Sequence, residues 1–233
     1  ASESTLEEVV VTGYGTQKAK EVTSSITSVK VEEFNKGNVN DPSQLLQGKV
    51  AGLSIARPGG NPNGEFKIRL RGISSLGQGS QPLIIIDGVP GASLNSVDPN
   101  DIQSIDILKD GSAAAIYGTR GSAGVILITT KQGVPGLAKV EYSGYVAYEQ
   151  VDRTVDVLSA DEYRAFGGGS DLGESINWFD EITQNAIQQT HNIALSGGSG
   201  QTQYRISFNV RDGQGVALNT GFSQLNGRLN LTQ

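Results

Sequence analysis

The chain has 233 residues, 36% of them apolar, and a formal net charge of −6 at pH 7. This apolar content supports a folded core, while the acidic balance argues against a nucleic-acid partner, which would need clustered Lys and Arg. The lack of cysteine excludes a disulfide scaffold and thiolate chemistry, and the lack of an apolar run of about 18 residues excludes a transmembrane helix.

The first twenty residues are predicted to form a polar extended arm around one apolar patch, Val9-Val10-Val11. Three consecutive β-branched residues favour a strand. Glu7 and Glu8 precede the patch and Gly13 follows it, and the sequence offers no obvious partner strand. We therefore expect an exposed strand whose backbone is unpaired.

The next segment predicts short strands around one short helix. Asp41 can cap a helix and Pro42 can occupy its first turn, so we expect a helix through Leu46 that Gly48 ends. The expected strands lie at 22–31, 51–56 and 66–70, with a turn at 59–64.

Two apolar runs dominate the segment from Ile68 to Gly133. Leu83–Ile86 and Val125–Ile128 are continuous apolar stretches, which predict strands buried on both faces. Asp87-Gly88 follows the first run, so we expect a tight turn between two buried strands, with Gly88 at positive φ.

Two short helices are expected between these strands. Asp98 before Pro99 has the pattern of a helix cap. Asp110 to Ser112 is predicted to open a second helix, which Gly118 would end.

Beyond residues 133–136 the pattern changes to strict apolar and polar alternation over longer runs, so we place a domain boundary there. Alternation of this kind is typical of antiparallel strands with one apolar face. A Gly-rich link at 197–200 is short, whereas the link over 150–188 is long and contains a capping box at Ser159 to Glu162. The alternating segments are 138–149, 203–211 and 225–231, with a weaker one at 191–195.

The order of four motifs closely resembles the plug domain of SusC/RagA-type TonB-dependent outer-membrane transporters. The motifs are LIIIDGVP at 83–90, IDILKD at 105–110, IYGTRG at 116–121 and GVILITTK at 124–131, with LEEVVVTGYGTQ at 6–17 ahead of them. The resemblance continues past the plug and covers nearly the whole chain.

The resemblance implies three parts: a TonB-box coupling arm at 1–20, an α+β plug domain at 21–135, and the first strands of an outer-membrane β-barrel at 136–233. The plug would have a mixed β-sheet with short helices, and the strands after it would be antiparallel and transmembrane. Large barrels of this kind have about 22 strands, so the chain would be an N-terminal portion that the remainder of the barrel completes.

The function that the resemblance implies is active import of glycans or peptides across the outer membrane of a Gram-negative bacterium. Implied partners are the periplasmic protein TonB, a SusD-like surface lipoprotein and the transported glycan or peptide. TonB would join the arm by β-strand addition. The implied TonB-coupling residues are Glu8, Val9, Val10, Val11, Thr12, Gly13 and Tyr14; no cofactor, no metal and no enzyme activity are expected.

The barrel hypothesis assigns opposite environments to the two faces of the segment at 203–211. Arginine facing hydrocarbon near the membrane midplane costs about 2 to 4 kcal/mol, so the charged face is expected to meet the plug or lumen. Tyr204, Ile206, Phe208 and Val210 are expected to face lipid, and Arg205, Asn209 and Arg211 the plug or lumen.

Other chemistries have weaker support in the residues. The single His191 has no acid at metal-ligand spacing, and adjacent acid pairs such as Glu7-Glu8 and Asp161-Glu162 point in different directions. Gly118, Gly121 and Gly124 imitate a dinucleotide fingerprint but lead into a strand, and Asp98, Asp101 and Asp106 lack the pattern of a calcium loop.

Two alternatives to the transporter stay open at this point. One is a soluble secreted or periplasmic β-rich binding module, which periodicity alone also allows; the other is a carboxylate-based glycosidase fragment. The aromatic residues of the long link could stack on a sugar or pack the link itself. They are Tyr163, Phe166, Trp178 and Phe179.

Overall fold

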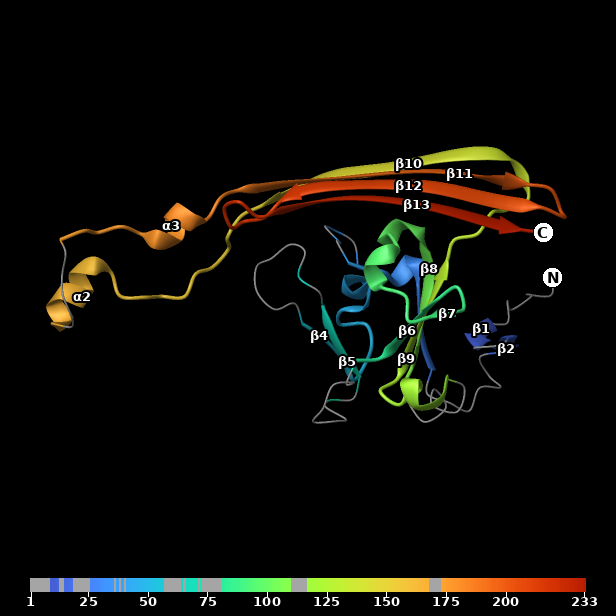
Figure 1. Cartoon of the computed structure of the whole chain (residues 1–233), viewed down its shortest axis with the longest axis horizontal. Coiled ribbons are helices and arrows are strands. Elements are labelled where there is room, and N and C mark those ends of the chain that lie inside the picture. Colours follow the sequence, from blue (N-terminus) through green and yellow to red (C-terminus); the bar gives the residue numbers. More distant parts are fainter. Residues whose placement is uncertain are drawn as a thin grey trace, which may run out of the picture.

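A computed structural model of the chain shows a mixed-sheet N-terminal body (residues 26–131) beneath a long antiparallel sheet (Figure 1). The predicted helix at 110–116 and most of the turn at 59–64 lie outside the described residues. Of the first eighteen residues, only the backbone of 9–12 and 15–18 is described. The other described residues are 26–35, 37, 39, 41–56, 64, 66–70, 72, 81–109, 117–167 and 173–233.

The body is organised around a mixed five-stranded sheet, as predicted. The strands are β3 (Ile26–Lys30), β6 (Leu83–Ile86), β7 (Val89–Pro90), β8 (Ile102–Leu108) and β9 (Val125–Thr130), in the order β3-β8-β9-β6-β7. Strand β6 runs parallel to β9, and the other pairs are antiparallel. Strands β4 (Leu53–Ala56) and β5 (Lys67–Leu70) form a separate antiparallel pair.

The central strands of this sheet are buried on both faces, which confirms the prediction for β6 and β9. Ile126 and Ile128 pack in the larger apolar cluster, together with side chains from 29 to 107. Val125 and Leu127 point to the other face and form a second cluster with Ile85. Burial of each such side chain contributes about 1.5 to 3 kcal/mol, so the body has an apolar core of its own.

Short 3-10 helices connect these strands, and two begin at the predicted caps. Asp41 accepts a hydrogen bond from the Ser43 amide at 2.7 Å, and Gly48 follows at φ +76°. Asp98 accepts one from the Asn100 amide at 2.8 Å. The helices are η2 (Val31–Glu33), η3 (Pro42–Leu46), η4 (Leu94–Ser96), η5 (Pro99–Asp101) and η6 (Gly118–Gly121).

The predicted tight turn at Asp87-Gly88 is present, with φ of +48° and +84°. Positive φ at both central residues is the signature of a type I′ hairpin turn. Both Asp87 carboxylate oxygens accept hydrogen bonds from Thr130, from its amide at 2.9 Å and its hydroxyl at 2.7 Å. The second strand is not buried, contrary to the prediction: Val89 is 61% exposed because β7 is the last strand of the sheet.

We expect Gly88→Val to destabilise the body by about 1 to 2 kcal/mol, because an L-residue in the left-handed region is strained. No atom lies within 4 Å of a Cβ at this position, so strain alone is tested. Gly200→Val is the matched control, since its surroundings are also open and its φ lies outside that region. The free energy of unfolding of the full-length protein measures both. Equal values for the two variants would contradict the assignment.

The arm differs from its prediction. Strand β1 (Val9–Thr12) is not unpaired but forms an antiparallel hairpin with β2 (Gly15–Lys18), in which Val10 lies opposite Gln17. Only two residues separate the strands in sequence, which is the commonest length for the connection of a β-hairpin. A partner strand would therefore have to add to the outer edge of this hairpin and not to an isolated strand.

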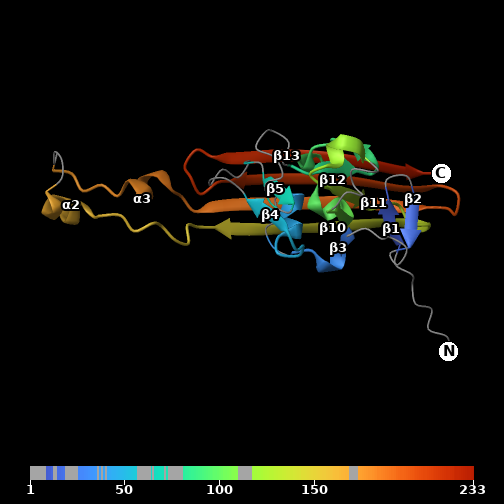
Figure 2. The same cartoon turned by 90° about the horizontal axis from the view of Figure 1, so that it is seen from below.

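The long sheet consists of β10 (Gly136–Glu149), β11 (Ala186–Gly198), β12 (Gln203–Gln214) and β13 (Gly221–Thr232), in chain order. Figures 1 and 2 show the four strands spread over the body. Gly133, just before β10, lies so close to β12 that a Cβ there would be 2.5 Å from the backbone of Tyr204.

The two faces of the sheet separate polar from apolar side chains, as the alternation predicts. Phe208 and Val210 on β12 are 53% and 43% exposed on the face away from the body, whereas Arg205 and Arg211 are buried against it. The other strands expose apolar side chains in the same way. They include Val140, Tyr142, Val146 and Tyr148 on β10, Ile187 and Ile193 on β11, and Leu225, Leu229 and Leu231 on β13.

The link between β10 and β11 spans 150–185 and projects beyond the sheet (Figure 1). It carries α2 (Ala160–Phe166) and α3 (Trp178–Ile182). The predicted capping box begins α2, and the hydrogen bonds that Glu162 accepts from Ser159 lower the pKa of Glu162. Within the described part of the chain, no helix is both long and apolar enough to cross a membrane.

Candidate functional site: the interface between body and sheet

The body contacts the long sheet through buried polar side chains. On β12 the residues that face the body are polar, and their exposed fractions are between 1% and 7%. They alternate with the apolar residues of the outer face because side chains of a strand alternate between its faces. These residues are Arg205, Ser207, Asn209 and Arg211.

Asp101, at the end of η5, is the centre of this interface. Its Oδ2 accepts hydrogen bonds from the Ser207 hydroxyl at 2.7 Å and the Asn209 amide at 2.9 Å. Its Oδ1 lies 3.6 Å from Nη2 of Arg205, whose Nη1 lies 3.6 Å from Glu141 on β10. One carboxylate of the body thus contacts three consecutive inward-facing residues of one strand.

A second buried ion pair lies at the other end of η5. Asp98 Oδ2 is 2.8 Å from Arg211 Nη2, and their side chains are 0% and 3% exposed. The same carboxylate uses Oδ1 to accept from the amide of Asn100. Asp98 therefore has two roles: it caps η5, and it binds η5 to β12 of the long sheet.

Strand β13 adds a third set of contacts, at the turn of β6 and the end of β9. Arg228 Nη1 lies 3.1 Å from Asp87 Oδ2. The Asn230 amide donates to the Thr130 hydroxyl at 3.0 Å and to the Lys131 carbonyl at 2.8 Å. The interface therefore spans the central part of the body, at η5, the turn after β6 and the end of β9.

Asp98→Asn is expected to destabilise the docked state by about 3 to 5 kcal/mol, because it removes the carboxylate that pairs with the buried Arg211 charge. Asparagine keeps an oxygen that can cap η5, so the loss reports on the ion pair. A second substitution, Arg211→Met, should recover part of the lost free energy of unfolding, because it also removes the buried charge. A denaturant titration of the full-length protein measures the free energy of unfolding.

Asp152→Asn is the matched control, since Asp152 pairs with Arg153 at 3.8 Å and their side chains are 95% and 92% exposed. Surface pairs of this kind contribute about 0 to 1 kcal/mol. If Asp98→Asn costs no more than this control, the buried pair does not hold body and sheet together.

The structure does not test the predicted role of residues 8–14 in coupling to TonB. The backbone of 9–12 is described, whereas Glu8, Gly13 and Tyr14 lie outside the described residues. His191 lies on the outer face of β11, where Tyr142 hydrogen-bonds its Nδ1 at 2.8 Å and stacks on its ring. The described residues contain no group of three or more His, Cys, Asp or Glu side chains that could hold a metal ion.

The sequence predicts the arginine side of the interface, but it does not identify which acidic residues of the body pair with each arginine. The sequence predicts Asp98 only as a helix cap, and it predicts no role for Asp101. The signal for their role is that both acids lie in the segment that leads into β8, and that residues 72–108 contain no Lys or Arg that could pair with them.

Comparison with known proteins gives the class of this fold. Residues 18–125 match the family model of the TonB-dependent Receptor Plug Domain. The chain is 38% identical to the TonB-dependent receptor SusC of Bacteroides thetaiotaomicron, covering 97% of this chain and 24% of that protein. It is 39% identical to the TonB-dependent receptor P3 of Formosa agariphila, covering 94% and 22%.

A solved structure agrees over the same extent. The RagAB peptide importer in its open-open state superposes with a TM-score of 0.85 and 27% identity, covering 96% of this chain and 30% of that chain. The chain therefore spans about a quarter of the length of the curated relatives it matches.

The fold and its interface define a plug domain docked on the polar face of a wall sheet. The chain belongs to the TonB-dependent receptors and corresponds to the N-terminal part of the SusC/RagA type. Below, the N-terminal body is called the plug and the long sheet the wall.

Proposed function

We propose that the chain is the N-terminal part of an energy-coupled importer in the outer membrane of a Gram-negative bacterium. The plug blocks the lumen that the wall and the rest of the barrel enclose, and the cargo is a glycan or a peptide. The observation that carries this proposal is the buried polar interface, in which Asp98 and Asp101 of the plug meet Arg211 and Arg205 of the wall.

The choice of which face of β12 is buried supports this proposal over a soluble binding module. A soluble sandwich would enclose the apolar face of β12 with a second sheet and leave its arginines in water. Instead Phe208 is 53% exposed and Arg205 is 7% exposed. An apolar outer face is what lipid requires of a barrel strand.

TonB and a SusD-like surface lipoprotein are the partners in this proposal. TonB binds residues 8–14 by adding a strand to the free edge of the arm hairpin, where main-chain hydrogen bonds supply the affinity. The lipoprotein covers the end of the barrel from which the link at 150–185 projects. Both assignments rest on the family and on the position of these segments in the chain.

Force on the arm reaches the plug through its edge strand. Strand β3 is the first described strand after the arm and pairs only with β8 within the described sheet. The wall contacts of Asp98, Asp101 and Thr130 hold the ends of β8 and β9. Pulling therefore separates β3 from β8 before it releases the central strands, since edge elements open at the lowest free energy.

Val10→Pro in the full-length transporter is expected to abolish uptake, because proline removes an amide donor from a strand that must pair with TonB. Val10→Thr keeps a β-branched residue and is the matched control. Uptake of labelled oligosaccharides and peptides by cells measures the effect, with surface expression measured in parallel. Unchanged uptake by a well-expressed Val10→Pro variant would refute the coupling role of the arm.

A further inference from the structure

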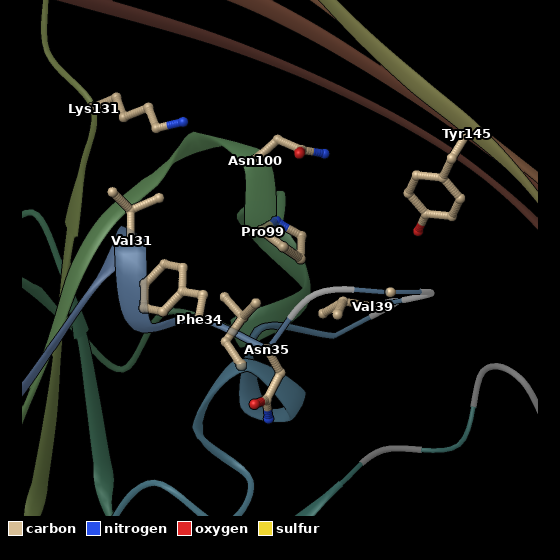
Figure 3. Close-up of a pocket in the computed structure, with 10 residues that line it drawn as sticks. Val31, Phe34, Asn35, Val39, Pro99, Asn100, Lys131 and Tyr145 are labelled. Atoms are coloured by element: carbon tan, nitrogen blue, oxygen red, sulfur yellow. The ribbon is translucent and has the colours of Figure 1, made fainter.

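A cavity of about 290 Å³ lies between the plug and β10 of the wall (Figure 3). Apolar side chains of the plug form much of its lining, chiefly Val31, Phe34, Val39 and Leu45. The volume is at the lower end of the range for small-molecule sites, about 300 to 1,000 Å³. The cavity can therefore hold a group the size of one amino-acid residue.

The polar lining of this cavity is concentrated around Lys131. Figure 3 shows the Lys131 side chain extending over the cavity from the end of β9, on the side of Asn100, with Tyr145 of β10 across from it. Within the described part of the chain, the Lys131 ammonium has no hydrogen-bond or ion-pair partner, although its backbone carbonyl accepts from Asn230. A cation is thus turned toward an open space that is otherwise largely apolar.

The surroundings of Lys131 disfavour its charge. Burial is the main cause that lowers the pKa of Lys131, and the nearby Arg205 guanidinium lowers it further. An anion in the cavity would reverse this effect, because an opposite charge at short range stabilises the ammonium. Three carboxylates oppose the shift in part, those of Asp101, Glu141 and Asp98.

We propose that this cavity binds a small molecule that joins one carboxylate to a compact apolar group. The carboxylate lies against the Lys131 ammonium and the Asn100 amide, and the apolar group lies on Val31 and Phe34. The C-terminal residue of a peptide and a free branched-chain acid share this chemistry. A neutral sugar fits poorly, since its hydroxyl groups would lose water without gaining partners on the apolar side.

The ligand would touch both the plug and the wall. Val31 and Phe34 belong to the segment that follows β3, and Tyr145 belongs to β10. Binding does not depend on the direction or the energy source of transport, so it is measured apart from uptake.

Isothermal titration calorimetry of the full-length protein in detergent tests the proposal with three probes. N-acetyl-leucine imitates the end of a peptide, 4-methylpentanoate is a free acid, and N-acetyl-leucinamide lacks the carboxylate. We expect the acids to bind and the amide not to bind. Tighter binding of N-acetyl-leucine than of 4-methylpentanoate identifies a peptide end, and equal or tighter binding of 4-methylpentanoate identifies a free acid. Equal binding of amide and acid, or no binding of either acid, would overturn the proposal.

Two variants locate the site. Lys131→Gln should weaken binding of the acids at least tenfold, because it removes a charge-assisted hydrogen bond. Lys139→Gln is the matched control, since Lys139 is exposed on β10 and pairs with Glu141, and its binding should be unchanged. Val31→Phe should block the cavity while keeping the ammonium.

The variants also separate a local effect from misfolding. Thermal unfolding midpoints equal to wild type show that each variant is folded. If Lys131→Gln does not fold, loss of binding in folded Val31→Phe still places the ligand in this cavity. If folded Val31→Phe binds the acids with wild-type affinity, the ligand lies elsewhere and the proposed site is refuted, whether or not Lys131→Gln also binds them.

Discussion

The pairing of two plug carboxylates with two wall arginines is the constraint on which the rest of the arrangement depends. Removing a charge from water costs several kcal/mol unless a partner is present at short range. Asp98 and Arg211 therefore have to meet, and so do Asp101 and Arg205. Because the arginines lie six residues apart on one face of β12, the two pairs together fix how the plug is positioned along the strand.

The core of the plug and its contact with the wall are built from different kinds of side chain. The core is apolar on both faces of the sheet, whereas the contact with the wall is made of charges and amides. Polar groups regain hydrogen bonds to water when they separate, while apolar groups do not. The contact with the wall can therefore open to water at a lower cost than the apolar core around the central strands β8 and β9.

Local sequence signals predicted the parts of this structure that depend on neighbouring residues. The two-residue period on β12 gave the faces of Arg205 and Arg211, and the Asp98-Pro99 pair gave the cap of η5. The plug carboxylate that pairs with each arginine lies more than one hundred residues away, and no spacing rule connects such positions. The pairing of β1 with β2 was not predicted, because Gly15 and Lys18 of β2 are residue types that are depleted in strands.

The close approach of Gly133 to the backbone of Tyr204 limits how the plug can move as a whole. The segment that joins plug and wall is packed against β12 at Gly133, and this contact restricts rotation of the plug about the segment. If the plug left as a rigid body, this segment would have to separate from β12. The hydrogen bond from Asn230 to the Lys131 carbonyl, just before the segment, would also have to break. In the proposed importer, a passage is therefore more easily opened by rearrangement inside the plug, with its C-terminal end left in place, than by expulsion of the whole domain.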